Sequence, residues 1–560
     1  MNDKVKIYCT NIKEYIDIKG GTTLIEIAES LKDRLDFTPI CAMVNYKAED
    51  MYFPVFSPKQ IEFLRAESPL SRRVYIRSLC MMLYKAVCLE VPGNNLRIEH
   101  SISRGYFCRL TDFEGNLTEI TEELCNRLIA RMKDIVRQNL RFRREEKLTA
   151  DVTKIFHKEH LNDKVLLLET SHSLYTKFYK LGNIADSYYG PLAPSTGYIS
   201  VFNLLPYKDG FLLMGRDPKD LDKPQKPEPQ EKLYKAFTDY LRFNQVIQVS
   251  NVGELNRAVK KKKTSQLINV AEAMHDKLLG RISDEISARN RDGGARIVLL
   301  AGPSSSGKTT TTKRLAIQLM TNLKVPRMIS LDDYFIDREH TPRDESGDYD
   351  FESLYALDLD LLNSDLRKLL DGETINLPSY SFELGKRVPK ERPLRLGKNE
   401  VLLIEGIHGL NPELTNSINV DEVFKIYVSA LTTLSIDDHN WISTNDNRLL
   451  RRIVRDYKYR NSSAYETIRR WPSVNRGEER WIFPFQENAD ALFNSSLIFE
   501  IGVMKDYALP LLGDVPHNTP QYAEAYRLMK LLSYFTSIPA EQIPTTSLLR
   551  EFLGGSSFHY

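Results

Sequence analysis

The sequence predicts a multidomain protein of the α/β class, with a doubly wound parallel sheet in its C-terminal half. From residue 295 onward, short apolar runs of strand length alternate with segments of helical periodicity. A glycine-rich turn lies between the first of these runs and the helix that follows it. A polar, proline-rich stretch at residues 215–235 separates this half from the front of the chain. With 560 residues the chain is too long for one hydrophobic core, and about 150 residues per domain gives three or four units.

Composition and charge exclude several classes of protein. Lysine and arginine number 77 against 75 acidic residues, so the overall charge gives no reason to expect nucleic acid or a membrane as a partner. No apolar run reaches the length of a membrane span, and the first residues contain no apolar signal segment, which predicts a soluble protein. The cysteines lack paired CxxC spacing, which favours reduced thiols, and hence the cytoplasm, over a disulfide or zinc framework. They are Cys9, Cys41, Cys80, Cys88, Cys108 and Cys125.

The first predicted unit, residues 1–66, is a small α+β domain. Alternation predicts a strand at residues 5–8, and apolar spacing predicts an amphipathic helix at 24–31 after a turn at Gly20 and Gly21. Strands are expected at 40–45 and 61–64. This layout resembles the TGS module found ahead of threonyl-tRNA synthetases and in some GTPases.

The second predicted unit, residues 67–215, resembles the threonyl-tRNA synthetase editing domain. The stretch from Asp186 to Gly197 is similar to that family's Asp-x-Cys-x-Gly-Pro-His-x-Pro-x-Thr-Gly motif, and residues 105–107 resemble its Gly-Phe-Tyr segment. The four positions of the family's metal-type ligands carry Tyr188, Leu192, Arg73 and Arg77 here. None of these side chains can serve as such a ligand, so editing chemistry is expected to be lost. A scaffold, an RNA or nucleotide binder and a regulatory module remain open.

Residues 216–290 are predicted to form a linker and a helical connector. The composition of residues 215–235 is too polar to form structure alone, whereas residues 231–290 have helical apolar spacing. Lys260 to Lys263 form a basic run within this segment. A solvated helix end explains the run, with phosphate or RNA contact as the alternative.

The third unit, residues 291–505, begins with a predicted phosphate-binding loop. A buried-type strand at 297–300 leads into the glycine-rich turn, and a helix follows at about 312–319. The glycines let backbone N–H groups surround a phosphate at the start of the helix, Lys308 reaches the β- and γ-phosphates, and Thr309 offers its hydroxyl to Mg²⁺. The alternative is a Ser/Gly turn without a ligand. The expected nucleotide-binding residues here are Gly302, Ser304, Ser305, Ser306, Gly307, Lys308, Thr309 and Thr310.

A carboxylate follows the second predicted strand, at residues 327–331. In a doubly wound sheet the carboxyl ends of the strands hold the ligands, so Asp332 is placed to accept the proton of an acceptor hydroxyl. A helix N-cap is the alternative reading of this aspartate. A helix around residues 353–370 and a third strand at 401–405 complete the alternating pattern.

Several motifs of this unit resemble those of the uridine kinase and phosphoribulokinase family over residues 290–500. They are the phosphate-binding loop, residues 331–335, 349–351, 378–382 and 403–408, and an arginine-rich segment, in the family's order and spacing. The resemblance implies that Asp332 is the general base and Lys308 a catalytic cation, and that Asp350 binds sugar hydroxyls. It also implies that Tyr380 and Arg387 line a nucleoside pocket and that Glu405 holds Mg²⁺ through water. A simple exposed residue at a strand end is the alternative for Glu405.

The arginine-rich segment is predicted to be a helix with its exit. Positions 448, 452 and 455 share one helical face, and guanidinium groups chelate phosphate oxygens in pairs. By the resemblance, this is the lid over the nucleotide, with Arg452, Arg455 and Arg460 as its contacts and Arg455 also catalytic. A solvated arginine-rich helix is the alternative.

Departures from the family concern the acceptor. Gly385 stands where uridine kinases have histidine, Phe335 stands where they have tyrosine, and the lid's Arg-Gly-Arg is Arg460-Asn461-Ser462. An acceptor other than uridine or cytidine is therefore plausible. Tyr334 and Arg343 are further candidates for the pocket.

Residues 506–560 are predicted to be a helical appendix, with helices at 521–535 and 540–553 and no chemistry. The chain as a whole is expected to be an ATP- and Mg²⁺-dependent kinase that phosphorylates a nucleoside hydroxyl, and to form a homo-oligomer. A kinase of another sugar or polyol is the alternative within the enzymes. An ATP-responsive regulatory protein, which contacts RNA through its N-terminal domains, is the alternative from a different class.

Overall fold

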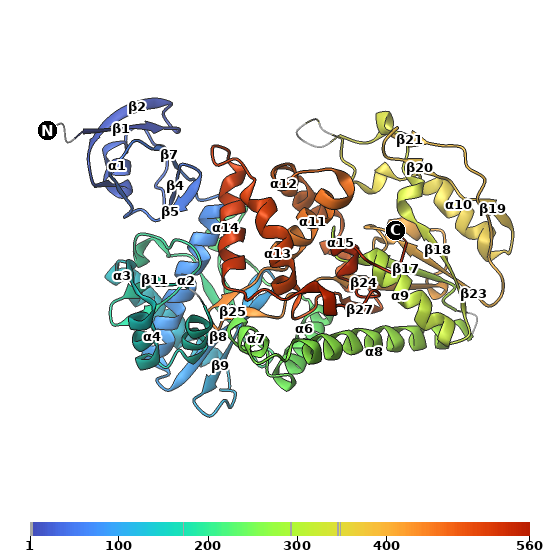
Figure 1. The fold of residues 1–560 in the computed structure, drawn as a ribbon, viewed down its shortest axis with the longest axis horizontal. Coiled ribbons are helices and arrows are strands. Elements are labelled where there is room, and N and C mark those ends of the chain that lie inside the picture. Colours follow the sequence, from blue (N-terminus) through green and yellow to red (C-terminus); the bar gives the residue numbers. More distant parts are fainter. Residues whose placement is uncertain (1–3, 172, 292–293, 344–346, 348, 560) are drawn as a thin grey trace.

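The computed structural model describes residues 4–171, 173–291, 294–343, 347 and 349–559. Figure 1 shows an elongated molecule with the N-terminal sheet at one end and the parallel sheet of the C-terminal half at the other. Between them lie helices α11 (Thr444–Arg460), α12 (Ala464–Trp481), α13 (Glu500–Gly513) and α14 (Gln521–Ser533). Among the described residues, no helix combines the length and the apolar composition needed to cross a membrane. All six cysteines are free, as their spacing predicts.

The N-terminal unit is a five-stranded mixed sheet with one helix packed on it. The expected strands and helix are all present, each within two residues of its predicted position, and Leu24 and Ile27 of the helix are buried against the sheet. The strand order is β2-β1-β7-β4-β5. The elements are β1 (Lys4–Cys9), β2 (Glu14–Lys19), β3 (Thr22–Thr23), α1 (Leu24–Ser30), β4 (Ala42–Val44), β5 (Lys47–Glu49), β6 (Pro54–Val55) and β7 (Gln60–Phe63).

The second unit surrounds a long central helix with two antiparallel sheets. Helix α2 (Pro69–Glu90) is buried over most of its length, between a sheet of order β13-β14-β9-β8 and one of order β10-β11-β12. The remaining elements are β8 (Asn94–Ile102), β9 (Gly105–Asp112), α3 (Glu122–Gln138), β10 (Arg143–Leu148), α4 (Thr149–Lys158), α5 (Asn162–Thr170), β11 (Tyr175–Leu181), β12 (Ile184–Asp186), β13 (Asn203–Tyr207) and β14 (Gly210–Met214). We call residues 4–224 the front region.

The prediction that the polar stretch after Gly215 lacks structure was wrong. Strands β15 (Arg216–Asp217) and β16 (Asp220–Pro224) form a hairpin, whose base is closed by the bond from the Gln225 N–H to the Gly215 carbonyl at 2.8 Å. A hairpin closes its own backbone hydrogen bonds and therefore needs little burial once its ends are fixed. The helical connector is confirmed as α6 (Glu231–Val246), α7 (Val252–Lys260) and α8 (Thr264–Arg291). Lys260 to Lys263 are exposed where α7 ends and α8 begins.

Helix α8 runs from beside the front region to the far sheet (Figure 1). That sheet has five parallel strands in the order β18-β23-β17-β24-β27, which confirms the predicted doubly wound class. Alternate residues of β17 enter two separate cores: Ile297 and Leu299 pack with α10, whereas Val298 and Leu300 pack with α8 and α9. Helices on both faces explain why this strand is apolar throughout. The elements are β17 (Ile297–Ala301), α9 (Lys308–Thr321), β18 (Val325–Ser330), α10 (Leu359–Leu370), β23 (Glu400–Glu405), β24 (Val423–Ser429) and β27 (Ala491–Asn494).

Two predicted helices of this half are shorter than expected. Helix α10 starts at Leu359 because the Asp358 side chain accepts the Leu361 N–H at 3.0 Å and caps it. The predicted helix at 540–553 is reduced to a turn at Ala540–Gln542 and α15 (Arg550–Leu553), since Pro544 lies between them and offers no N–H donor. Helix α14 (Gln521–Ser533) is confirmed. The other elements are α11 (Thr444–Arg460), α12 (Ala464–Trp481), α13 (Glu500–Gly513), β19 (Thr374–Asn376), β20 (Tyr380–Ser381), β21 (Lys386–Arg387), β22 (Pro393–Arg395), β25 (Ser435–Asp437) and β26 (Asn440–Trp441).

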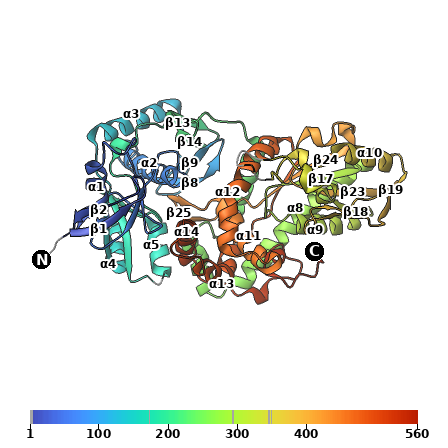
Figure 2. The ribbon, with the colours of Figure 1, turned by 90° about the horizontal axis from the view of Figure 1, so that it is seen from above.

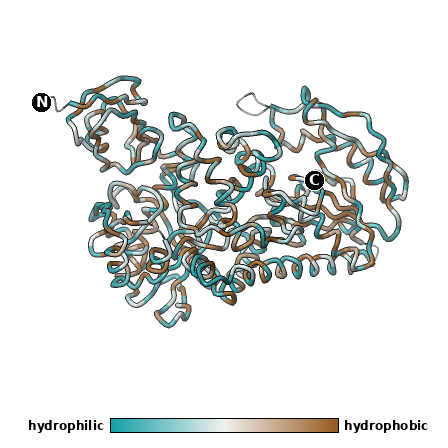
Figure 3. Tube along the Cα trace, in the orientation of Figure 1, coloured by the Kyte–Doolittle hydropathy of each residue, from teal (hydrophilic) through white to brown (hydrophobic). Residues whose placement is uncertain are grey.

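The last helices of the chain join the two ends of the molecule. Viewed from above, α11–α14 lie between the front region and the parallel sheet (Figure 2). Hydrophobic residues concentrate in the strands of that sheet, whereas α8 alternates between hydrophobic and hydrophilic positions along its length (Figure 3). A single buried cluster extends from α5 through α7 and α8 to the sheet and α11–α14, so the helices hold the two ends together through shared apolar burial.

Candidate functional site

The glycine-rich turn forms a compact loop at the carboxyl end of β17. A Cβ on Gly302 would lie 2.0 Å from the Val428 carbonyl oxygen, and Gly307 has φ +84°, so both positions require glycine. Lys308 begins helix α9 and its Nζ donates to the carbonyls of Gly302 at 2.9 Å and Pro303 at 3.2 Å. The lysine therefore bridges the loop that the sequence predicts as a phosphate cradle.

Carboxylates surround Lys308. Burial lowers the pKa of its ammonium group, while Glu405, Asp332, Glu551 and Glu352 each act to raise it. Burial also raises the pKa of Glu405 and of Glu352 to about 7. The cleft thus concentrates negative charge around one lysine, and such a site favours the binding of a cation.

Thr309 and Glu405 meet in this cleft. The Thr309 hydroxyl donates to the Glu405 carboxylate at 2.9 and 3.1 Å, although the two residues belong to α9 and β23. Among the described residues there is no group of three or more His, Cys, Asp or Glu that could hold a metal ion. Mg²⁺ is commonly held by one or two protein oxygens together with substrate phosphates, and this hydroxyl–carboxylate pair has the donor chemistry for it.

Asp332 lies in the short turn Leu331–Tyr334 that follows β18. It does not cap a helix, because the Ser330 side chain accepts the Asp332 N–H and caps this turn. The Asp332 side chain is exposed, yet desolvation by the protein around it raises its pKa, with Lys308 and Arg460 opposing that rise. The aspartate therefore lies within electrostatic reach of the loop lysine, at the edge where the sequence places it.

The arginines of α11 face the loop. Arg452 donates to the Ser304 hydroxyl at 2.7 Å, and Arg448 donates to the Ser304 carbonyl at 2.9 Å. Asp456 pairs with Arg452 and Arg455 at 3.2 and 2.8 Å and lies 3.7 Å from Arg460. The alternative prediction, a solvated arginine-rich helix, is wrong for most of these arginines, since Arg448 is only 2 % exposed. The Arg460 side chain, by contrast, is 59 % exposed. Arg460 is the arginine with most freedom to move toward a ligand.

Glu478 of α12 is a residue of the loop that sequence reasoning missed. Its carboxylate accepts the Ser304 N–H at 2.8 Å and forms an ion pair with Arg448. Ser304 and Glu478 are 174 residues apart, and no local motif marks the glutamate. Glu352, beside it, is the second acidic residue of the cleft that the sequence did not indicate.

An aromatic cluster lies next to the Asp332 turn. The ring of Phe335 is 5.6 Å from that of Tyr380 and 5.7 Å from that of Phe382, and Phe351 packs at its other edge. Gly385 turns the chain between β20 and β21 with φ +66°, and a Cβ there would lie 2.7 Å from the Arg338 guanidinium. Arg338 therefore occupies the space beside Gly385 and is a candidate pocket residue that the motifs did not reveal.

Arg387, expected to line the acceptor pocket, instead forms hydrogen bonds that stabilise the turn at Leu331–Tyr334. Its guanidinium donates to Asp358 at 3.0 Å and to the carbonyls of Phe335 and Tyr334 at 3.2 and 3.3 Å. Tyr334 was expected as a pocket candidate, but its side chain is buried and its hydroxyl donates to Asp365 of α10 at 3.1 Å. Asp350 accepts the Glu352 N–H at 3.2 Å, so it lies beside the acidic side of the cleft.

The C-terminal appendix reaches the loop, which the sequence did not suggest. Glu551 of α15 accepts the Thr310 N–H at 3.2 Å and the Thr310 hydroxyl at 2.6 Å. Leu548 packs against Gly307. The start of α9 is thus covered by residues 241 positions away in the chain, and the reading of the appendix as packing without chemistry was incomplete.

In the front region, the four positions that correspond to the editing domain's metal-type ligands carry side chains that are buried or bonded to other groups. Arg77 is buried and donates to the Pro191 carbonyl at 3.1 and 3.2 Å, with its guanidinium over the Tyr189 ring. Arg73 pairs with Glu524 of α14 at 2.7 Å. Tyr188 and Leu192 are buried. The Arg73–Glu524 pair joins the front region to the C-terminal helices, whereas the Arg77 contacts stay within the front region.

Comparisons with known proteins match the half of the chain that carries this cleft. The model of the phosphoribulokinase / uridine kinase family matches residues 297–498, beginning at the first residue of β17. A uridine kinase of Staphylococcus aureus (strain JH9) is 30 % identical over 200 residues, 35 % of this chain and 86 % of the relative. A uridine kinase of Brevibacillus brevis is 29 % identical over 202 residues, 36 % of this chain and 85 % of the relative. A solved structure titled as a possible uridine kinase from Bacillus stearothermophilus is 20 % identical, with TM-score 0.24, and covers 36 % of this chain and 89 % of that one.

Proposed function

The chain belongs to the phosphoribulokinase/uridine kinase family, and on this premise we propose that it is an ATP-dependent kinase that phosphorylates a nucleoside hydroxyl. The observation that carries the proposal is the grouping of Lys308, Asp332 and the Thr309–Glu405 pair at one edge of the sheet. A protein that only senses ATP does not need a base placed for an acceptor hydroxyl.

In this proposal the loop positions the nucleotide. The N–H groups at the start of α9 bind phosphate oxygens, and Lys308 moves from the loop carbonyls to the β- and γ-phosphates. Mg²⁺ held by Thr309 and Glu405 would neutralise charge on those phosphates. Arg452, Arg455 and Arg460 close over the nucleotide, and Arg455 stabilises the charge that develops on the transferred group.

The acceptor lies between Asp332 and the aromatic cluster. Asp332 accepts the proton of the attacking hydroxyl, and Asp350 binds neighbouring sugar hydroxyls. The rings of Phe335 and Tyr380 offer a surface on which a nucleobase can stack. Arg387 contributes by fixing the turn that carries Asp332 rather than by direct contact.

A kinase of another sugar or polyol is the second candidate. The observation that favours it is Arg338, whose guanidinium fills the space beside Gly385 and lies next to the Tyr380 hydroxyl. A half-buried guanidinium suits a polar or anionic acceptor better than it suits an uncharged base.

The test is acceptor-dependent ADP production by the full chain with ATP and Mg²⁺, over a panel of nucleosides, sugars and polyols. Turnover on one nucleoside, abolished by Lys308→Ala and by Asp332→Ala, supports the proposal. Turnover only on a sugar or polyol selects the second candidate. If no acceptor stimulates ADP production, while RNA binds with an affinity that falls steeply with salt, the kinase proposal is wrong.

A further inference from the structure

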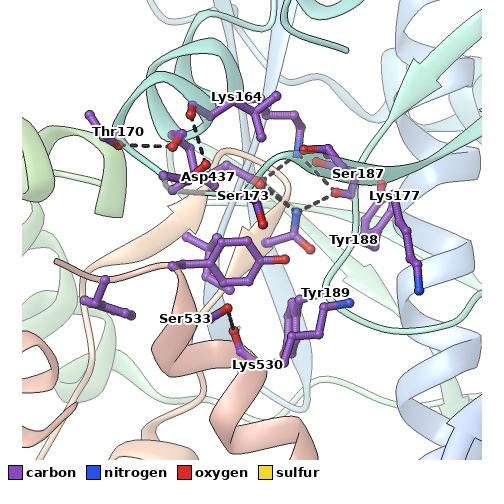
Figure 4. Close-up of a pocket in the computed structure, with 18 of the residues that line it drawn as sticks. Lys164, Thr170, Ser173, Lys177, Ser187, Tyr188, Tyr189, Asp437, Lys530 and Ser533 are labelled. Atoms are coloured by element: carbon purple, nitrogen blue, oxygen red, sulfur yellow. Dashed lines mark hydrogen bonds and ion pairs between the residues drawn. The ribbon is translucent and has the colours of Figure 1, made fainter. Parts of the chain in front are cut away.

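A second cavity, of about 480 Å³, lies between the front region and the C-terminal helices. None of the residues of the glycine-rich loop lines it. Its walls come from α5 and β11 of the front region, from the β25–β26 hairpin, and from α13 and α14 (Figure 4). Small-molecule sites in proteins typically enclose about 300–1,000 Å³ and often form where separate units meet. Both the size and the place of this cavity therefore fit a ligand site.

The lining carries more positive than negative charge. Lys177, Lys505 and Lys530 line the cavity, and no ion pair within 4.0 Å is found for them in the part of the chain that the structure describes. Lys505 donates to the Phe535 carbonyl at 2.5 Å, and Lys177 stands opposite Glu146 in the β10–β11 pair. The two acidic residues of the lining are Glu146 and Asp437. Asp437 is already neutralised, because it pairs with the buried Lys164 at 2.8 Å and accepts two hydrogen bonds from Asn440.

The surroundings of Lys530 show the same imbalance. Burial, together with the charges of Arg77, Lys177 and Arg144, lowers the pKa of this lysine to about 8. Glu49 acts in the opposite direction. Arg144 is itself paired with Glu49 at 3.0 Å and Asp50 at 2.8 Å, so Arg77 and Lys177 are the cations near Lys530 that carry no such pair among the described residues. An anionic ligand would stabilise the charged form of Lys530.

The rest of the lining offers rings and hydroxyls. Tyr188, Tyr189 and Tyr534 contribute aromatic rings, and Ser173 and Ser187 contribute hydroxyls to the same lining (Figure 4). Tyr188 is 5 % exposed, and its hydroxyl, although near Asp186, makes no hydrogen bond of standard geometry among the described residues. A buried polar group of this kind is held in place by its surroundings, so the Tyr188 ring forms a fixed part of the wall.

We propose that this cavity binds a small organic phosphate, a phosphomonoester of about the size of a nucleoside monophosphate. Lys177, Lys505 and Lys530 hold the phosphate group, and the tyrosine rings pack on the organic part. The site is separate from the catalytic cleft, and the proposal does not depend on the kinase activity.

The test is isothermal titration of the full chain with UMP, with ribose 5-phosphate and with inorganic phosphate, in the absence of ATP and Mg²⁺. Lys530→Gln and Lys177→Gln are the cavity variants. Lys177 is exposed on β11, so its substitution removes a charge without disturbing the core. Lys235→Gln is the matched control, because Lys235 is an exposed lysine of α6 outside the cavity. Lys308→Ala removes binding at the glycine-rich loop.

UMP or ribose 5-phosphate is expected to bind one site per chain more tightly than inorganic phosphate. Each cavity variant should weaken this binding about tenfold to a hundredfold, the effect of losing one charged hydrogen bond. Lys235→Gln and Lys308→Ala should leave it unchanged. The proposal is overturned if neither organic phosphate binds, or if binding is lost in Lys308→Ala and kept in Lys530→Gln. Equal affinity for inorganic phosphate would show that the cavity takes the free ion and not an ester.

Discussion

Lys308 in the catalytic cleft and Lys530 in the second cavity both have a pKa lowered by burial, but their neighbours carry opposite charge. Four carboxylates, those of Glu405, Asp332, Glu551 and Glu352, act on Lys308. Cations act on Lys530, with one opposing glutamate. The first site balances a lysine against acids and needs a further cation before it can hold a triphosphate. The second has a surplus of positive charge in its lining and, in our proposal, holds a phosphate without a further cation.

This difference indicates how each site should respond to metal, pH and mutation. In the proposed kinase site, chemistry would depend on carboxylates that must be ionised and on a metal that joins them to phosphates. In the cavity, binding depends on lysines that must stay protonated. The two sites should therefore be separable by single substitutions and by chelation.

The largest expected effect is the loss of kcat on substitution of Asp332, the proposed general base. Asp332→Asn should lower kcat by about 10²- to 10⁴-fold, since the amide cannot accept the proton of the acceptor hydroxyl. Stopped assays of ADP formation with the preferred acceptor measure kcat, and titration with a non-hydrolysable ATP analogue should show an unchanged affinity. Asp333→Asn is the matched control, because Asp333 pairs with Arg392 at 2.8 Å. An equal loss of kcat in both variants would contradict the role of Asp332 as base.

Chelation should separate the two sites. With EDTA in excess, acceptor-dependent ADP formation should fall to background, because Thr309 and Glu405 cannot balance the phosphate charge alone. Binding of an organic phosphate in the second cavity should persist under the same conditions. Metal-dependent binding in the cavity would break the comparison between the sites.

The pH dependence of kcat/KM should report the ionisation of the carboxylates in the proposed kinase site. The ionised form of Glu405 is needed for the metal, and its pKa is about 7, so kcat/KM should rise about tenfold between pH 6 and 8. Raising Mg²⁺ should move this rise to lower pH, because bound metal favours the carboxylate. A profile that is flat over this range at low Mg²⁺ would contradict the assignment of Glu405.

Replacing Lys530 should change the stability of the fold, and this change should shrink as the pH rises, whereas kcat/KM should increase with pH. Its folded pKa is depressed to about 8, so the protonated lysine destabilises the fold, and this cost is present below pH 8 and disappears above the lysine's ordinary pKa. Lys530→Met should raise the Tm at pH 6 by about 2–4 °C, with the gain shrinking toward pH 10. Calorimetry at both pH values measures it, with Lys235→Met as the control. A gain that is the same at both pH values would mean that the charge is not its cause.

The smallest expected effect concerns the C-terminal segment. Glu551 accepts the N–H and hydroxyl of Thr310, groups that a bound nucleotide would otherwise use. Glu551→Gln should therefore lower the KM for ATP about two- to tenfold, the effect of weakening one hydrogen bond. Glu541→Gln, at an exposed position of the same segment, should leave the KM unchanged. A higher KM in Glu551→Gln would show instead that the glutamate supports the loop.

Sequence reasoning succeeded where the information is local. The strand–loop–helix unit at 297–321, the aspartate after β18 and the glutamate ending β23 were placed correctly because strand alternation, glycine geometry and helix periodicity act over a few residues. The helix predicted at 540–553 is interrupted for a local reason too, because Pro544 cannot donate a backbone hydrogen bond. The prediction that Tyr334 lines the acceptor pocket was wrong because adjacent side chains on a turn point in different directions. Only the tertiary contact of Tyr334 with Asp365 decided that this side chain became buried.

The sequence by itself determined the family, the parallel sheet and the residues that stand at the ends of its strands. Only the tertiary structure decided which distant groups complete them: Glu478 on Ser304, Glu551 on Thr310, and Arg338 beside Gly385. It also created the second cavity, whose lysines come from β11, α13 and α14 and carry no shared motif. The physical reason is that backbone preferences are local, whereas burial and charge depend on which segments pack together, and those segments lie hundreds of residues apart.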